Sequence, residues 1–289
     1  MSETKPTPLV FIYDFDGTLA PGEMQEHSFI PAVGMKSRAF WKQSNDLARE
    51  AHGDRILLYM HLMLQEAMLH SLRRSREAFR EHGKGISFFP GVETWFQRIN
   101  REGGKRGLEV KHYVISSGLL EMIEGTRIYP EFEKVFASTF LYDADGVAVG
   151  PALAINYTTK TQFLFRINKG ALDLADDTTV NAYIPKQDRA VPFENMVYIG
   201  DGSTDIPCFR LVREQGGTSV AVYDPAKPAL EGRAAKLIDE QRVDFVAAAD
   251  YGEGSPLDEF MRAVMDAVAA RARQRTLARQ TRRKRPALG

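Results

Sequence analysis

The sequence predicts an α/β fold: a doubly wound, mainly parallel sheet with an α-helical domain inserted after the first strand. Two observations support this prediction. Short apolar runs of strand length alternate with segments of helical periodicity, an order typical of βαβ units. The runs at residues 9–13, 110–115 and 196–199 are each followed by acidic or hydroxyl side chains. In open α/β sheets, ligands bind at the carboxyl ends of the strands, where such side chains would gather.

The first apolar run, residues 9–13, has the composition of a buried parallel strand. Asp14 and Asp16 follow it, and in an extended chain both point to the same side. Two neighbouring carboxylates repel each other and are costly to desolvate, so a cation or a shared proton must offset their charge. We expect Mg²⁺, which prefers oxygen ligands. Ordinary turn chemistry would also explain an Asp-x-Asp-Gly-Thr stretch, and this run alone leaves that alternative open.

A long helical segment follows the first strand. Pro21 and Gly22 end the strand, and from about residue 36 to about residue 80 apolar residues recur at three- and four-residue spacing. A break near Gly53 and Asp54 indicates two or more long helices. An insertion at this point in the chain would lie over the strand ends as a lid. A helical bundle with no gating role remains the alternative.

The second strand is predicted at residues 110–118 and ends on Ser116, Ser117 and Gly118, with a helix expected from Leu119. A helix through about Asn100 should precede it. Hydroxyl and backbone N–H groups at such a strand end form a favourable site for an anion. The same Ser-Ser-Gly stretch would also serve as a simple helix cap.

A β-hairpin with an Asp-Gly turn is expected at residues 139–152. Lys160 then begins a helix that Gly170 ends. A lysine in the first turn of a helix is unfavourable against the helix dipole unless an anion lies nearby. Residues 173–192 have the composition of a loop. Lys160 is therefore a candidate for contact with an anion.

The third strand repeats the pattern of the first, because residues 196–200 lead directly into Asp201 and then Asp205. Together with Asp14, these two residues are candidates for an oxygen-ligand cage around a cation. Asp205 is equally suited to cap the following helix. Beyond them we expect a strand at residues 219–222, a helix at 226–238, an edge strand at 245–249 and a final helix from about residue 256.

Composition places the chain among globular proteins of a reducing cytosol. It has 289 residues and equal numbers of basic and acidic side chains, 38 each. Cys208 is the single cysteine and has no partner for an internal disulfide. No apolar stretch reaches membrane-spanning length, and the first residues lack the apolar core of a signal peptide. We therefore expect a cytoplasmic protein with no membrane partner.

The last 19 residues, 271–289, form a basic tail without any acidic residue. Such a tail is suited to nucleic acid or anionic lipid, or to contact with its own protein. It lacks aromatic residues for base stacking, so we do not expect nucleic acid as a partner. We favour a solvated helix end that leads into a disordered terminus. Its basic residues are Arg271, Arg273, Arg275, Arg279, Arg282, Arg283, Lys284 and Arg285.

In their order along the chain, these motifs resemble the haloacid dehalogenase (HAD) superfamily of phosphohydrolases. The resemblance rests on residues 14–18 (Asp-Phe-Asp-Gly-Thr), Ser116, Lys160 and residues 200–205 (Gly-Asp-Gly-Ser-Thr-Asp). Within the superfamily the chain looks most like phosphoserine-phosphatase-type enzymes (subfamily IB), because the helical insertion lies between the first two motifs and a hairpin precedes the lysine. It departs from them in Thr204, where they usually have Asn, and in a longer segment after the lysine.

The resemblance implies a Rossmann-like HAD core at residues 1–19 and 87–270, and a helical C1-type cap at residues 20–86. It also implies an activity, that of a Mg²⁺-dependent phosphatase acting on a small phosphorylated metabolite. Asp14 would be the nucleophile that forms an aspartyl-phosphate, and Asp16 the general acid and base. The second acid favours a phosphatase over a dehalogenase, because an alkoxide is a poor leaving group without a proton.

The remaining site residues also follow from the resemblance. Ser116 and Lys160 would hold the phosphoryl oxygens, and Lys160 would also restrain Asp14. The metal ligands would be Asp14, Asp201, the backbone carbonyl of Asp16 and, directly or through the second coordination sphere, Asp205. We further expect Thr18, Glu23, Ser117 and Gly118 to contact the substrate. Two alternatives stay open: a phosphotransferase or mutase of the same superfamily, and a catalytically silent binding protein whose basic tail attracts nucleic acid. The oligomeric state is left open.

Overall fold

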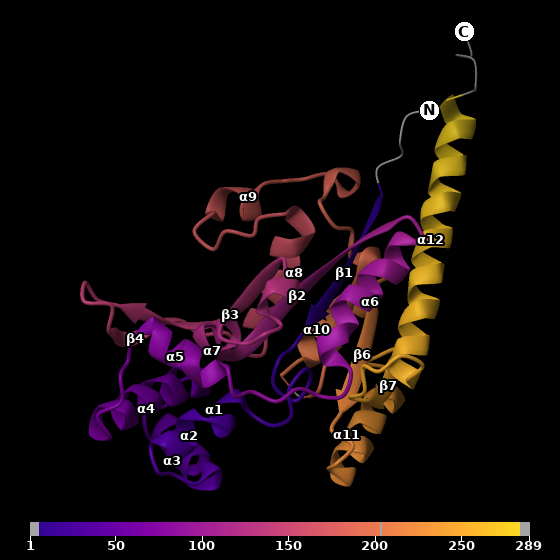
Figure 1. The fold of residues 1–289 in the computed structure, drawn as a ribbon. Coiled ribbons are helices and arrows are strands. Elements are labelled where there is room, and N and C mark those ends of the chain that lie inside the picture. Colours follow the sequence, from indigo (N-terminus) through magenta and orange to yellow (C-terminus); the bar gives the residue numbers. More distant parts are fainter. Residues whose placement is uncertain (1–5, 203, 284–289) are drawn as a thin grey trace.

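A seven-stranded, mainly parallel sheet forms the centre of the protein (Figure 1). The structure is a computed structural model that describes residues 6–202 and 204–283. The strand order is β4-β3-β2-β1-β5-β6-β7, and the described strands pair in parallel except for the antiparallel pair β3 and β4. The strands are β1 (Thr7–Tyr13), β2 (Leu108–Leu119), β3 (Lys134–Tyr142), β4 (Ala148–Leu153), β5 (Met196–Gly200), β6 (Thr218–Tyr223) and β7 (Phe245–Ala248).

Helices cover both faces of the sheet. Successive side chains of β1 point to opposite faces, so they contribute to two separate core clusters. Phe11 and Tyr13 belong to a core cluster shared with α6 (Val92–Gly104) and α12 (Pro256–Arg283). Val10 and Ile12 belong to a second cluster, shared with α8 (Thr159–Lys169) and α10 (Ile206–Glu214). The predicted doubly wound α/β fold is confirmed.

The segment between β1 and α6 is helical, with its main break at Asp54, as the sequence predicts. The Asp54 side chain accepts hydrogen bonds from Ile56 N and Leu57 N at the start of the fourth helix. Its helices are α1 (Met24–His27), α2 (Phe29–Ala32), α3 (Ser37–Glu50), α4 (Arg55–Leu69) and α5 (Arg76–Gly83). In Figure 1 these helices lie together beyond the ends of the central strands.

Helix α5 is fastened to the core through α7 (Leu120–Glu124). A Cβ atom at Gly83 would collide with the backbone of Met122, and one at Gly125 would collide with the backbone of Arg80. The Arg80 guanidinium also lies 2.8 Å from the Glu124 carboxylate. The two helices therefore meet backbone to backbone, and this contact fixes one side of the helical insertion on the sheet domain.

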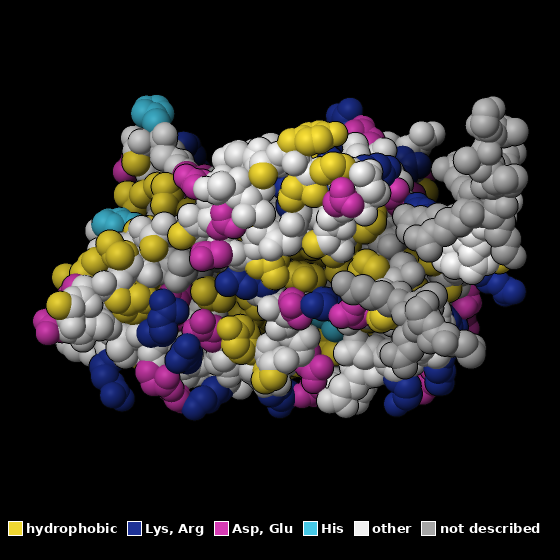
Figure 2. Space-filling view, turned by 90° about the horizontal axis from the view of Figure 1, so that it is seen from above, with side chains coloured by type: hydrophobic (Ala, Val, Ile, Leu, Met, Phe, Trp, Pro, Cys, Tyr) yellow, Lys and Arg dark blue, Asp and Glu magenta, His cyan; other side chains and the backbone are white. Residues whose placement is uncertain are grey.

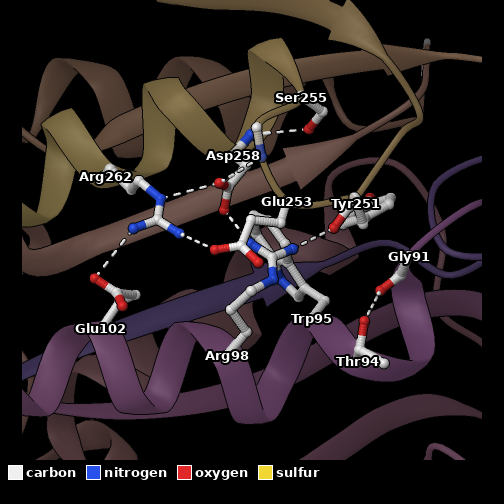
Figure 3. Close-up of polar contacts among 12 residues, drawn as sticks. Gly91, Thr94, Trp95, Arg98, Glu102, Tyr251, Glu253, Ser255, Asp258 and Arg262 are labelled. Carbon is white, nitrogen blue, oxygen red and sulfur yellow. Dashed lines mark hydrogen bonds and ion pairs between the residues drawn. The ribbon is translucent and has the colours of Figure 1, made fainter.

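Helix α12 is joined to α6 by a buried ion-pair network (Figure 3). Arg98 on α6 donates to the Asp258 carboxylate and to the Tyr251 carbonyl. Arg262 Nε lies 2.9 Å from Asp258 Oδ2, and its guanidinium lies 3.1 Å from Glu102. Because Arg98 and Asp258 are both buried, neither charge has bulk water as an alternative partner. The network thus holds the start of the last helix in register with α6.

Three elements differ from the sequence expectations. Helix α6 continues to Gly104, past Asn100, and Glu102 and Gly103 in its last turn are buried against the rest of the protein. Strand β2 continues through Leu119 with a bulge between Ser116 and Leu119, and the helix expected from Leu119 follows directly as α7, which begins at Leu120. The loop at residues 173–192 contains a short helix, α9 (Asp177–Asn181).

Other sequence predictions agree with the structure. Strands β3 and β4 form the predicted hairpin, and β7 lies at the sheet edge next to β6. Helix α8 ends at Gly170, which has a left-handed conformation. Helix α11 (Pro228–Asp239) lies between β6 and β7 in the chain. None of the helices in the described ranges is long and apolar enough to cross a membrane.

The basic tail begins as a continuation of α12, which extends to Arg283; residues 284–289 lie outside the described residues. Its first basic side chains contact the body of the protein. Arg271 donates to the Glu194 carbonyl at 3.1 Å, and Arg275 lies 3.4 Å from the Glu194 carboxylate. On the face shown in Figure 2, basic and acidic side chains are interspersed.

Candidate active site

A cavity of about 830 Å³ lies at the carboxyl ends of three neighbouring strands. Asp14 and Asp16 follow β1, Ser116 lies near the end of β2, and Asp201 follows β5; all four line the cavity. Side chains of the helical insertion and of α11 complete its walls. A parallel sheet brings these strand ends to one edge, which is why residues far apart in the sequence meet here.

Three carboxylates form a cluster in this cavity. Oxygen atoms of Asp14, Asp201 and Asp205 all lie within 4.8 Å of one another. Burial and the charge of Asp205 raise the pKa of Asp14 to about 7, against the opposing effect of Lys160. Burial, together with Asp205 and Asp14, raises the pKa of Asp201 well above its usual range. This all-oxygen set, crowded enough to favour proton uptake, fits a hard divalent cation.

Lys160 lies among these carboxylates rather than on the cavity wall. Its Nζ is 2.7 Å from Asp14 Oδ2 and 2.8 Å from Asp205 Oδ1, and its side chain is fully buried. Burial alone would lower the pKa of Lys160, but the charges of Asp14 and Asp205 outweigh it and raise the pKa. The lysine therefore stays charged and holds Asp14 in place. Its first-turn position on α8 is explained by these two anions.

Asp205 supports the lysine and does not cap its helix. It occupies the N-cap position of α10 without a side-chain capping hydrogen bond. Its Oδ1 accepts hydrogen bonds from Lys160 Nζ at 2.8 Å and from Tyr198 OH at 2.7 Å, and Gly202 N donates to its Oδ2 at 3.3 Å. The sequence left capping and a site role open, and the contacts favour the site role.

The Asp16 carboxylate lies beside the cluster and is not one of its three members. Its Oδ1 accepts a hydrogen bond from Met24 N at 2.9 Å. Burial raises the pKa of Asp16 well above its usual range, and the charges of Glu23 and Asp14 add to this effect. A carboxyl group whose pKa is raised in this way is suited to hold and donate a proton.

The irregular end of β2 supplies the next part of the site. Ser116 Oγ accepts a hydrogen bond from Gly118 N at 3.0 Å, and both residues line the cavity. Tyr59 OH, on α4, donates to the Ser117 carbonyl at 2.7 Å. A Cβ atom at Gly118 would approach Asp16 Oδ2 to 2.9 Å and collide with Met24. Glycine is therefore needed where the insertion approaches β2.

Gly17 is required for a different reason. Its φ of 70° lies in the left-handed region, and a Cβ atom there would collide with the Asp201 carboxylate. The turn after Asp16 and the end of β5 are thus packed against each other through a glycine. This contact brings the first and last of the four motifs together.

The structure does not bring every expected substrate contact to the cavity. Of the residues expected to contact substrate, Glu23, Ser117 and Gly118 line the cavity, whereas Thr18 does not. Thr18 is fully buried, and its carbonyl accepts a hydrogen bond from Tyr251 OH at 2.9 Å. Thr18 therefore has a place in the turn, and its expected contact with substrate is not supported. Lys160 is also absent from the residues that line the cavity, and its Nζ contacts Asp14. Of its two expected roles, the contacts therefore favour restraint of Asp14.

Some residues of the site carried no signal in the sequence. Tyr59 and Gln25 come from the helical insertion, and Gln25 is buried with its side-chain oxygen unpaired. Lys227 and Arg233 come from the region of α11. None of these belongs to a motif with fixed spacing, and only the fold places them beside the aspartates.

Comparison with known proteins is consistent with this geometry. A family model described as haloacid dehalogenase-like hydrolase matches residues 11–210. An uncharacterized protein of Borreliella burgdorferi is 29% identical over 280 residues, covering 86% of this chain and 93% of its own.

Two solved structures share the fold. A HAD family hydrolase of Salmonella enterica serovar Typhi matches with a TM-score of 0.53 and 18% identity, over 80% of this chain and 67% of its own. A substrate-bound phosphoserine phosphatase matches with a TM-score of 0.53 and 18% identity, over 89% of this chain and 98% of its own. The phosphoserine-phosphatase-like fold expected from the motifs is confirmed, and the chain belongs to the haloacid dehalogenase-like hydrolase family.

Proposed function

We propose that the protein is a Mg²⁺-dependent phosphomonoester hydrolase that acts on a small phosphorylated metabolite through an aspartyl-phosphate. The observation that carries this proposal is the position of Asp14. Its carboxylate lies at the cavity, 2.7 Å from the buried ammonium of Lys160 and in a cluster with Asp201 and Asp205. A nucleophile held by a fixed cation beside a cation site is the arrangement that phosphoryl transfer needs, because alignment and charge neutralisation dominate that reaction.

Asp14 and Asp201 would hold the Mg²⁺ ion directly, with the backbone carbonyl of Asp16 as a further ligand. When bound, Mg²⁺ would offset negative charge on the phosphoryl oxygens. Asp205 would act from outside this shell, because its Oδ1 is already bonded to Lys160 and Tyr198. The cluster suits Mg²⁺ because its three members offer only carboxylate oxygens, which are ligands that this ion prefers.

In the first step, an Asp14 carboxylate oxygen attacks phosphorus and the ester P–O bond breaks. Asp16 donates its proton to the departing alkoxide, so the products of this step are the free alcohol and an aspartyl-phosphate on Asp14. The raised pKa of Asp16 supports its role as the proton donor. Ser116, at the end of β2, would hold a phosphoryl oxygen, and Lys160 would keep Asp14 aligned.

In the second step, the Asp16 carboxylate takes a proton from a water molecule, which attacks phosphorus. The bond between phosphorus and Asp14 breaks and inorganic phosphate is released, which restores both aspartates. Covalent capture divides a difficult hydrolysis into two easier displacements. A single carboxyl group can serve both steps because it ends the first step deprotonated.

The helices at residues 20–86 would be a cap on a core made of residues 1–19 and 87–270. Their contact with the site supports this division, since Tyr59 on α4 donates to the Ser117 carbonyl and Glu23 and Gln25 line the cavity. A cap in this position would exclude water during the first step and contact the leaving group. Its side chains would then decide which alcohol is accepted.

The test is phosphate release from p-nitrophenyl phosphate by the purified protein, with Mg²⁺ and with excess EDTA. We expect turnover with Mg²⁺, loss of turnover with EDTA, and loss in Asp14→Asn. Asp145→Asn is the matched control, because Asp145 is an exposed aspartate at the tip of the β3–β4 hairpin. Full activity of Asp14→Asn, or activity that is indifferent to EDTA, would contradict the proposal.

A further inference from the structure

The cavity continues past the carboxylate cluster to a wall that carries positive charge. Arg233 and Lys236 on α11, and Lys227 just before it, line the cavity from the core. Arg55, the first residue of α4, lines it from the helical insertion. We call these four residues the basic wall. None of them belongs to the motifs that placed the aspartates.

Most of the basic wall is not neutralised by the protein. Among the residues that the structure describes, no carboxylate oxygen lies within 4.0 Å of the charged nitrogens of Arg55, Arg233 or Lys236. Lys227 Nζ has Asp224 at 3.5 Å. Of the other acids that line the cavity away from the carboxylate cluster, Glu240 is paired with Arg242 at 2.6 Å, and Glu23 and Glu26 lie at the start of the helical insertion. Arg55, Arg233 and Lys236 are thus solvent-exposed cations at the cavity, with no carboxylate partner in the described ranges.

The same cavity has apolar walls as well. Trp41 and Ile56 line it from the insertion, and Leu230 and Leu237 line it from α11. A volume of about 830 Å³ is far more than one phosphoryl group needs and lies in the range of sites for larger organic ligands. There is room for a phosphate ester whose carbon skeleton extends from the aspartates toward α11.

We infer that the substrate carries a second anionic group, a phosphate or a carboxylate, which the basic wall binds while the first phosphate lies at Asp14. This inference rests on the proposed function and narrows its substrate class to phosphate esters with two separated anionic groups. Guanidinium groups suit such a partner, because their planar fork donates two parallel hydrogen bonds to phosphate or carboxylate oxygens. The wall residues select the substrate and take no part in bond breaking.

The experiment compares matched synthetic esters with Mg²⁺ present: n-alkyl monophosphates, alkanediol bisphosphates of increasing chain length, and ω-phosphoalkanoates with a terminal carboxylate. We expect at least one chain length at which a doubly anionic ester exceeds its alkyl monophosphate in kcat/KM by about tenfold. Comparison of the bisphosphates with the terminal carboxylates shows whether the second anionic group is a phosphate or a carboxylate. Equal kcat/KM for singly and doubly anionic esters at every length would overturn the inference while leaving the proposed function intact.

The double variant Arg233→Ala and Lys236→Ala should abolish most of this preference, measured within the variant as the ratio of kcat/KM for the doubly anionic ester to that for its alkyl monophosphate. Arg273→Ala is the control, because Arg273 is exposed on α12 and does not line the cavity. A preference that persists in the double variant contradicts the inference.

Calorimetric binding of the same esters to Asp14→Asn tests the wall without turnover. Tighter binding of the doubly anionic ester, lost on adding the two α11 substitutions, supports the inference even if no ester is hydrolysed by the wild-type protein. That combination would overturn the proposed function alone. Equal binding of both kinds of ester would overturn the inference.

Discussion

Lys160 Nζ lies 2.7 Å from Asp14 Oδ2, and both side chains are buried at the carboxyl end of the sheet. The pair joins α8 to the end of β1, and it exists because the sheet brings these two elements to one edge. A buried carboxylate beside two others is stable only with compensating positive charge. The lysine therefore serves both the fold and the carboxylate that we propose as the nucleophile.

Replacing Lys160 by Met should remove both functions. Without the ammonium, Asp14 and Asp205 lose their shared partner, and we expect the free energy of unfolding to fall by about 3 kcal/mol and phosphatase turnover to be lost. Urea denaturation and initial rates measure the two effects. Lys42→Met is the control, because Lys42 is exposed and, within the described part of the chain, forms an ion pair with Asp46 on its own helix and with no other acid. Unchanged stability of Lys160→Met would contradict the role of the buried pair.

Gly17 and Gly34 form a matched pair for testing the packing of the site. Both have positive φ, 70° and 68°, but a Cβ atom at Gly17 meets Asp201 whereas one at Gly34 meets open space. Each change to Ala should destabilise the fold by about 1 kcal/mol through backbone strain. Only Gly17→Ala should also weaken Mg²⁺ binding and turnover, because only it displaces Asp201. Equal turnover in the two variants would argue against this contact.

Asp16→Asn should affect substrates in proportion to their need for a proton. Alkyl phosphates release a basic alkoxide, so we expect their turnover to fall by about a hundredfold or more. p-Nitrophenyl phosphate releases a weakly basic phenolate, so its first step should fall much less. Rapid-quench measurement of alcohol and phenol release separates the two cases. An equal loss for both leaving groups would exclude Asp16 as the proton donor.

The raised carboxyl pKa values predict how Mg²⁺ stabilises the protein at different pH. Asp14 has a folded-state pKa of about 7, and the pKa values of Asp16 and Asp201 are also raised, whereas the unfolded values lie near 4. Between about pH 4 and pH 7, the metal-free folded state therefore binds more protons than the unfolded state. These groups therefore contribute stability that is present below about pH 4 and is lost as the pH rises through about 7.

Because Mg²⁺ replaces those protons, the increase in Tm that it causes should be larger at pH 8 than at pH 5.5. Thermal denaturation with and without Mg²⁺ at the two values measures this difference. Asp201→Asn should remove most of the Mg²⁺ effect at both values. An equal increase in Tm at pH 5.5 and pH 8 in the wild-type protein would contradict the proton-for-metal exchange.

The Arg98–Asp258 pair gives a test that is independent of the site. Arg98→Met leaves the Asp258 carboxylate buried beside Arg262 as its remaining cation, and we expect the free energy of unfolding to fall by about 3 kcal/mol. The double variant Arg98→Met and Asp258→Leu should recover part of that loss, because it removes the second charge as well. Equilibrium urea unfolding measures both. A double variant less stable than the single one would contradict the account of the network.

The sequence predicted the parts of this protein that depend on local pattern. The run before Asp14 and the run before Asp201 are apolar enough to be buried strands, and Gly170 ends its helix as expected. The irregular course of β2 past Ser116 was missed, because a bulge is decided by the neighbouring strand and not by the Ser-Ser-Gly composition. The buried position of Thr18 was missed for a similar reason, since Tyr251, which it contacts, is far away in the chain.

Side chains that complete the cavity were the least predictable. Tyr59 has the spacing of an ordinary core residue on α4, and its hydroxyl reaches Ser117 only because the insertion packs on the sheet. The basic wall is equally hidden, since Arg233 and Lys236 look like the solvated face of α11 in the sequence. The motifs predicted the aspartates and the lysine of the candidate site, whereas tertiary contacts determine which other side chains line the cavity.

The most direct test of the account is the chemical state of Asp14 during turnover. The Asp16→Asn variant, incubated with p-nitrophenyl phosphate and Mg²⁺ and quenched in acid, should accumulate a phosphorylated peptide, and tandem mass spectrometry should place the phosphoryl group on Asp14. The same treatment of Asp14→Asn should give no such adduct. A phosphoryl group on another residue, or hydrolysis in which no phosphorylated protein ever forms, would contradict the central claim that the Asp14 carboxylate attacks phosphorus.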